Sequence, residues 1–282
     1  MARVIGQSGA WSAIASDIAR CGHAVSAPGD LPALFDTLTN SRPTSIEKHR
    51  QKTHAAVQER TTKIAQLRAQ RGLFRVLLNT VRIRAIKSQI AAAYALYAAY
   101  ASSLDQAIVR VGSHLGSPEF AGAQAEFAVI GRLRQLPDRF LVFNDVQLRA
   151  NRRIQFDGIG LQSAQIDHVV LSKCGVFAIE TKYWSRKFIE SGKFHDPFDQ
   201  SRRAGYLLYD LLRQSFGKTR VRNIIACAGS LPEAPPKTYI DVVRLDGLVD
   251  HISRYYREEF GDAKLQALRN FFERRVASGM ES

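Results

Sequence analysis

Cysteine is scarce in this 282-residue sequence, and its three copies are widely separated. Cys21, Cys174 and Cys227 form no CxxC pair, and no histidine stands at zinc-finger spacing from them. Neither a disulfide framework nor a structural zinc site is therefore indicated. The opening residues, Met1–Ala10, also lack the apolar segment that follows the basic start of a signal peptide. These absences predict a protein of the reducing cytoplasm.

Long apolar segments are missing as well. The uncharged stretch Ile90–Leu104 has fifteen residues, whereas a helix that spans a bilayer needs about 20. Its alanines and tyrosines fit the packing of one helix on another. A membrane-associated helical hairpin is the alternative for this stretch, but the sequence does not favour a membrane as a partner.

Acidic residues are outnumbered by basic ones. Lys and Arg total 40 against 26 Asp and Glu, which gives a formal charge of +14 and a pI near 10.0. The excess is marked between Arg42 and Lys87, where twelve Lys or Arg stand against only Glu47 and Glu59. Such a charge attracts polyanions, and we predict a nucleic-acid partner, with DNA favoured over RNA. A solvated helix face is the alternative interpretation of the basic stretch.

The stretch Gln165–Tyr183 carries the clearest chemical pattern. Two apolar runs, Ile166–Leu171 and Val176–Ile179, flank the segment Ser172–Gly175. Apolar, largely β-branched runs around a glycine-containing turn predict an antiparallel hairpin.

The register of this hairpin brings charged residues together. If the turn is centred between Lys173 and Cys174, Asp167 lies opposite Glu180 on one face of the sheet. Side chains alternate along a strand, so Lys182 shares that face with Glu180. Two opposed carboxylates repel each other unless a cation or a proton lies between them. Oxygen ligands suit Mg²⁺ or Mn²⁺, so the pattern predicts a divalent metal site.

The pattern of an acid, any residue and a lysine is weak by itself. It recurs at Asp262–Lys264, where no apolar strand precedes it and a solvated helix is predicted. Glu180–Lys182 differs because an apolar strand leads into it and a partner strand supplies a second acid. The alternative interpretation is a surface ion-pair cluster at the end of a sheet.

Further segments accompany the hairpin in a fixed order. They are a helix that opens with Gly122–Glu126, a strand containing Phe143–Val146, the segments Gln165–His168 and Gly175–Lys182, a helix with Pro197 and Gln200 near its start, and a late strand at Val221–Ala228. This ordered set resembles the nuclease-related domain (NERD) family, a branch of the restriction-endonuclease-like PD-(D/E)xK superfamily. The resemblance covers about residues 122–229.

The resemblance implies roles for particular residues. Asp167 and Glu180 would bind the metal ion, Lys182 would be the catalytic lysine, and Glu126 would be an accessory acid from the first helix. Supporting polar positions fall at Gln165 and Gln200. For Glu126 the alternative is a helix-surface carboxylate that is stabilised by the helix dipole.

Two neighbours of these residues need separate interpretation. His168 follows Asp167 but should point to the opposite face of the strand, so we interpret it as a packing or polar contact and not as a metal ligand. Many family members follow the lysine with a small polar residue, whereas Tyr183 and Trp184 follow it here. This departure concerns the edge that would face a substrate.

We predict four parts in the chain: residues 1–43 as a short helical and linker segment, 44–115 as a basic helical region, 118–236 as the NERD-like domain, and 237–282 as a C-terminal strand and helical extension. No chemistry is evident in the first part. In the second, apolar residues recur at helical spacing from Thr44 onward, and Arg71–Gly72 interrupts the pattern. Two antiparallel helices and one long coiled coil both fit, and these helices could join copies into a homo-oligomer.

The predicted fold is α/β, with a restriction-endonuclease-like mixed sheet of four strands flanked by helices and preceded by a helical, coiled-coil-like region. The predicted function is a Mg²⁺-dependent nuclease that hydrolyses phosphodiester bonds in DNA or RNA with metal-activated water. The alternative is a catalytically inactive module that binds nucleic acid or assembles copies through the same fold, because a fold does not fix a function.

Overall fold

The computed structural model describes residues 1–70, 73–184, 186, 190, 197–230 and 239–276, with only the backbone described for 73–75. The chain divides into two compact units. One unit combines Met1–Ser16 with Gly116–Ser282, and the other comprises Asp17–Leu115. The predicted helix break at Arg71–Gly72 and the predicted boundary between residues 236 and 237 lie outside the described residues.

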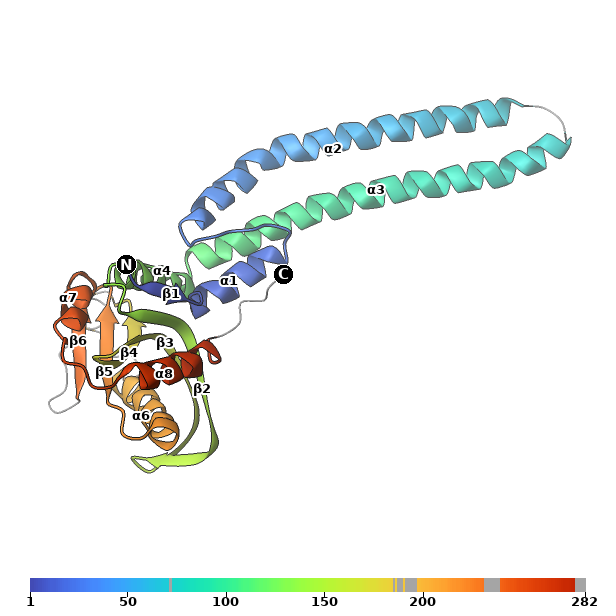
Figure 1. Cartoon of the computed structure of the whole chain (residues 1–282). Coiled ribbons are helices and arrows are strands. Elements are labelled where there is room, and N and C mark those ends of the chain that lie inside the picture. The colour runs from blue at the N-terminus through green and yellow to red at the C-terminus, as the bar shows by residue number, and fades with distance from the viewer. Residues whose placement is uncertain (71–72, 185, 187–189, 191–196, 231–238, 277–282) are drawn as a thin grey trace. The chain divides into compact units, whose positions relative to one another are not determined.

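The first unit is built on one six-stranded sheet with the strands in chain order (Figure 1). The strands are β1 Arg3–Ile5, β2 Leu141–Phe156, β3 Ile159–Ser172, β4 Gly175–Lys182, β5 Val221–Cys227 and β6 Ile240–Arg244. The pairs β2–β3 and β3–β4 are antiparallel, whereas β1–β2, β4–β5 and β5–β6 are parallel. The predicted mixed sheet is therefore confirmed.

The prediction of four strands was wrong, because β1 and β6 extend the sheet at its two edges. β1 has only three residues, which is too short for an alternating pattern to show in the sequence. A strand was predicted near Ile240–Arg244, but nothing in its sequence shows which strand it pairs with. In the structure it pairs with β5.

The register of the β3–β4 hairpin agrees with the prediction. His168 pairs with Ile179, and Ser172 pairs with Gly175 across a two-residue turn. Gly175 has a φ of +134°, a conformation that favours glycine. The turn therefore fixes which residues of the two strands share a face.

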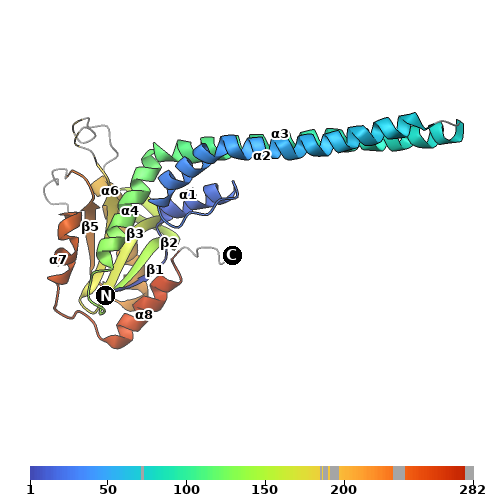
Figure 2. The same ribbon diagram turned by 90° about the horizontal axis from the view of Figure 1, so that it is seen from above.

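Helices cover both faces of the sheet (Figures 1 and 2). They are α4 Pro118–Leu133, α6 Pro197–Phe216, α7 Leu248–Ser253 and α8 Asp262–Glu273, while α1 Gly9–Ala19 follows β1. Buried leucines of α6 and Phe272 of α8 pack in one apolar cluster, and α4 and α7 contribute Leu133 and Ile252 to another. The predicted α/β class with flanking helices is confirmed.

The second unit is a helical hairpin made by α2 Asp30–Ala69 and α3 Leu73–Leu115. The two helices run antiparallel and pack on each other (Figures 1 and 2). Arg42 forms a two-pronged ion pair with Asp105, and the His49 and Tyr100 rings stack with centroids 3.7 Å apart. Of the two predicted arrangements, the antiparallel pair is the one observed.

One series of α3 side chains that are shielded from solvent recurs at alternating spacings of four and three residues. They are Asn79, Ile83, Ile86, Ile90, Ala93, Tyr97, Tyr100, Leu104, Ala107 and Val111. This is the heptad pattern of a coiled coil. Among the described residues, no helix combines the length and the apolar character needed to cross a membrane.

The predicted turn-rich linker before Thr44 is replaced by helix, since α2 begins at Asp30 and continues through Pro43. Pro32 lies in the first helical turn, where the missing N–H has no intrahelical partner to lose. Pro43 removes one backbone hydrogen bond inside the helix, but the neighbouring Arg42 is fixed across the hairpin by Asp105.

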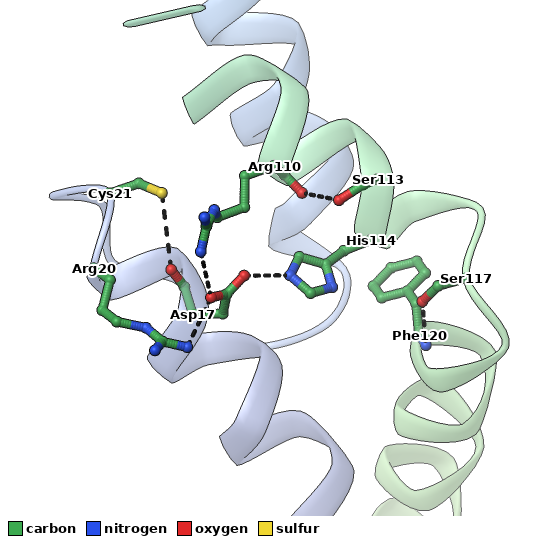
Figure 3. Close-up of polar contacts among 8 residues, drawn as sticks. All are labelled: Asp17, Arg20, Cys21, Arg110, Ser113, His114, Ser117 and Phe120. Carbon is green, nitrogen blue, oxygen red and sulfur yellow. Dashed lines mark hydrogen bonds and ion pairs between the residues drawn. The ribbon is translucent and has the colours of Figure 1, made fainter. Parts of the chain in front are cut away.

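Asp17 gathers three donors at the open end of the hairpin (Figure 3). Its carboxylate accepts hydrogen bonds from His114 Nε2 at 2.9 Å, from Arg110 at 2.8 Å and from Arg20 at 2.8 Å. The hydrogen bond from His114, supported by the two arginines, lowers the pKa of Asp17 below its usual value. The contact ties α3 to the segment that precedes α2.

Gly229 permits a close approach of two backbones beside the end of β4. An alanine Cβ there would lie 2.3 Å from the carbonyl oxygen of Trp184, which accepts the Ser230 N–H. We expect Gly229→Ala to lower the free energy of unfolding by about 2 kcal/mol, measured by urea denaturation. Gly131→Ala is the matched control, because nothing lies within 4 Å of its new Cβ and helix propensity predicts a gain of up to about 1 kcal/mol. Equal effects of both changes would contradict this account.

Candidate functional site

Four carboxylates from four elements lie close enough to influence one another electrostatically. Asp167 belongs to β3, Glu180 to β4, Glu126 to α4 and Asp145 to β2. Burial, followed by the charges of Glu180 and Glu126, raises the pKa of Asp167 well above its usual value. Burial and the charges of Asp145 and Glu180 raise the pKa of Glu126. The site therefore holds more negative charge than its surroundings stabilise.

Asp167 is anchored by the neighbouring strand. Its Oδ2 accepts the backbone N–H of Thr181 at 2.7 Å. The paired residues of β3 and β4 stop at His168 and Ile179, so the predicted opposition of Asp167 and Glu180 falls one step beyond the paired ladder. The hydrogen bond to Thr181 keeps the Asp167 carboxylate against the end of β4.

Lys182 provides a positive charge at this strand end. Its Nζ donates to Glu180 Oε1 at 2.6 Å and to Gln200 Oε1 at 3.2 Å, and the Glu180 side chain is only 6% exposed. Gln200 lies in the first turn of α6. Glu180 and Lys182 share one face as the strand alternation requires, and α6 brings Gln200 to them.

The two residues after Lys182 differ in burial. Trp184 is buried beside Phe198 and Ile225, whereas Tyr183 is 56% exposed. The departure from the family pattern thus supplies one core aromatic and one aromatic side chain at the surface.

Glu126 is held by the first residues of the chain. Its Oε2 accepts the Ser8 hydroxyl at 2.6 Å, and the backbone of Ala10 also hydrogen-bonds to it. Ser8 Oγ in turn accepts the N–H of Trp11 and so caps α1. No chemistry was predicted for residues 1–43, so Ser8 is a residue of the candidate site that the sequence did not reveal. A single serine before a helix gives no sequence signal beyond that of a cap.

Asp145 is the second missed residue. It is 8% exposed and has a φ of +52°, which is uncommon for a residue other than glycine. Gln165, predicted as a supporting residue, donates from Nε2 to Asp145 Oδ1 at 2.5 Å. Among the described contacts Gln165 thus supports Asp145 and not Asp167. The available signal was an acid inside the predicted strand segment Phe143–Val146.

A buried polar chain lies behind the carboxylates. Asn144 Nδ2 donates to the Gly6 carbonyl at 3.0 Å, and its Oδ1 lies 2.8 Å from His168 Nδ1. His168 Nε2 lies 3.0 Å from Thr181 Oγ1. Because Asn144 Oδ1 can only accept, His168 carries its proton on Nδ1 and accepts the Thr181 hydroxyl. Its position on the opposite face from Asp167 agrees with the prediction.

His168 stays neutral in this environment. Burial lowers its pKa to about 3. This chain of hydrogen bonds connects Gly6, which follows β1, to Thr181. The backbone N–H of Thr181 in turn holds Asp167. Sequence spacing predicted on which face of the sheet His168 lies. It did not predict its hydrogen-bond partners, which belong to β2 and β4.

The carboxylate oxygens of this site are the type of ligand that hard divalent cations prefer. Within the described residues, no three His, Cys, Asp or Glu side chains are grouped closely enough to hold a metal ion. Mg²⁺ commonly binds through only one or two carboxylates, together with water and substrate phosphates. Asp167 and Glu180 meet that requirement, and their unfavourable negative charge is the kind that a cation relieves.

One family model matches the part of the chain that holds this site. Residues 121–228 match the family model NERD, the nuclease-related domain, so the predicted resemblance is confirmed for this part of the chain. No curated protein matches the sequence. Among solved structures, the chain is similar to protein VC1899 from Vibrio cholerae at 11% identity and a TM-score of 0.28, over 92% of this chain and 61% of that chain.

Proposed function

We propose that the protein is a metal-dependent nuclease that hydrolyses phosphodiester bonds in DNA, with RNA as the second substrate class. The observation that carries the proposal is the geometry of one strand end, where half-buried Asp167 accepts the Thr181 N–H and buried Glu180 accepts the Lys182 ammonium group. Perturbed carboxylates with one adjacent lysine are typical of sites that combine metal binding with charge stabilisation. The nuclease-related family match supports this reading.

Each residue has a proposed task. Asp167 and Glu180 would hold Mg²⁺ or Mn²⁺, which supplies a water of lowered pKa and a Lewis acid for the phosphate. Lys182 would orient the attacking water or stabilise negative charge on the phosphate in the transition state. Gln200 would position the Lys182 ammonium group, and Glu126 would act as a more distant acid.

The competing function is a module that binds nucleic acid or assembles copies with an inactive site. The +14 charge would serve such a module equally well. The two functions separate in their dependence on Asp167. A binding module retains its salt-dependent affinity in Asp167→Ala, whereas an enzyme loses turnover.

The proposal is tested by cleavage of labelled single-stranded and duplex DNA and RNA with Mg²⁺ or Mn²⁺. We expect wild type to cut at least one substrate, and Asp167→Ala and Lys182→Ala to fail on all of them. Binding without cleavage on every substrate would favour the module. Cleavage that survives both substitutions would place the active site elsewhere.

Metal-free protein should also lose stability as the pH rises. Asp167 has a folded-state pKa above its unfolded value of about 3.9. Between the unfolded and the folded pKa of Asp167, the folded state therefore binds more protons than the unfolded state. The free energy of unfolding falls as the pH rises through the folded pKa. We expect Asp167→Asn to unfold at a higher temperature than wild type at pH 7 without metal, and Mg²⁺ to stabilise wild type alone. Thermal unfolding with and without Mg²⁺ measures this, and equal metal effects would contradict it.

A further inference from the structure

Aliphatic side chains are exposed together at the closed end of the helical hairpin. Val76, Leu77, Leu78 and Val81 have 55%, 73%, 49% and 70% of their surface in solvent. They lie in the first turns of α3, which starts where the two helices are joined (Figure 1). A cluster of this kind on a water-facing helix marks an interaction site.

Exposed cations lie in the same part of the hairpin as these aliphatic residues. Arg68 at the end of α2 and Arg82, Arg84 and Lys87 on α3 are all exposed. Within the described part of the chain, none of these four side chains forms an ion pair with an acidic residue. The sequence from Arg60 to Leu104 contains no Asp or Glu at all. The cations therefore remain available for a partner.

Three of these cations share a hollow between the helices. Arg68, Arg84 and Lys87 line a groove of about 480 Å³ together with Asn79 and Thr80. Its three cations suit anionic phosphate oxygens, and Val76 is one of its apolar lining residues. We call the four aliphatic residues 76, 77, 78 and 81 and the four cations the hairpin tip surface.

The two kinds of side chain lie close together along the helix axis. An α-helix rises 1.5 Å per residue, so Arg84 lies about 10 Å behind Leu77. Arg82 directly follows Val81, and Arg68 lies level with this part of α3, because Asn79 Nδ2 donates to the carbonyl of the preceding Leu67. Aliphatic side chains and cations are therefore interspersed over about 10 Å along the axis, a length comparable to the boundary between acyl chains and phosphate headgroups. Interfacial helices bury their apolar side chains about 5–10 Å into this boundary.

We propose that the hairpin tip surface docks on the surface of a bilayer that contains anionic lipids. The aliphatic residues would enter the acyl boundary while the cations contact lipid phosphates, and no helix would cross the membrane. A nucleic acid would neutralise the cations but leave the aliphatic residues in water. A second copy of the chain would bring like charges together at this surface.

The test is flotation of the full-length protein with vesicles. Vesicles of phosphatidylcholine alone are compared with vesicles of equal parts phosphatidylcholine and phosphatidylglycerol, at low and high salt. Leu77→Ser/Val81→Ser removes exposed apolar surface, and Arg82→Gln/Arg84→Gln removes two charges. Leu96→Ser/Val109→Ser is the matched control, because these α3 residues are 73% and 71% exposed away from the tip. Duplex DNA binding is measured on the same proteins by fluorescence anisotropy.

Wild type should float with the anionic vesicles and not with phosphatidylcholine. The arginine variant should bind vesicles about 30-fold more weakly, and the apolar variant about tenfold more weakly with unchanged DNA binding. The control should match wild type, and circular dichroism should show equal helix content throughout. Absence of flotation by folded wild type would overturn the proposal. Loss of flotation in the control would do the same, as would arginine-dependent DNA binding without flotation.

Discussion

Replacing Lys182 with methionine is expected to lower the rate of phosphodiester cleavage by a factor of about 10²–10³. Methionine retains most of the side-chain length but donates no hydrogen bond and carries no charge. The Lys182 ammonium group contacts Glu180 and Gln200 in the structure, so its loss removes the positive charge of the site. Single-turnover cleavage of the substrate that wild type cuts measures the effect.

The second acid–residue–lysine pattern supplies the control. Lys264 lies on α8, donates to the Lys218 carbonyl and has the same spacing from Asp262 as Lys182 has from Glu180. Lys264→Met should leave cleavage within about a factor of two of wild type, because exposed substitutions away from a site have small effects. Comparable losses in the two methionine variants would show that general basicity, and not the strand end, drives the reaction.

Replacing His168 with leucine is expected to lower the free energy of unfolding by about 3 kcal/mol. The change leaves Asn144 Oδ1 and Thr181 Oγ1 buried without their present partner, and each such group costs about 1–3 kcal/mol. His54→Leu is the control, because His54 is exposed on α2. Urea unfolding measures both, and a loss in His168→Leu no larger than the loss in His54→Leu would contradict the polar chain.

The same histidine predicts acid sensitivity. Its folded-state pKa is lowered from 6.5 to about 3, so the unfolded state binds the extra proton between these values. Its contribution to stability is present above pH 6.5 and declines by about 1.4 kcal/mol per pH unit as the pH falls below it. His168→Gln retains one donor and one acceptor but does not titrate, so it should show a shallower decline between pH 6.5 and 4.

Local sequence was sufficient for the centre of the fold. The segment Ser172–Gly175 defined the turn of the β3–β4 hairpin and hence its register. Alternation along β4 then placed Glu180 and Lys182 on one face, and their hydrogen bond agrees. These features depend on neighbours in the chain, which a single sequence displays.

Contacts between distant segments were not predictable in the same way. Ser8 reaches Glu126 across 118 residues, and β1 is too short to carry a periodic pattern. Asp145 adopts a left-handed backbone conformation that its residue type does not demand. Pro43 lies inside α2 because packing against α3 outweighs the local preference. In each case tertiary contacts decide the outcome.

Titration of the purified protein with Mn²⁺ by isothermal calorimetry directly tests the proposal that Asp167 and Glu180 hold a divalent metal ion. Wild type should bind the ion in the absence of any nucleic acid, and Asp167→Asn should lose most of that binding while it remains folded. Mn²⁺ binding of equal strength in wild type and Asp167→Asn, or no binding to either, would contradict the account.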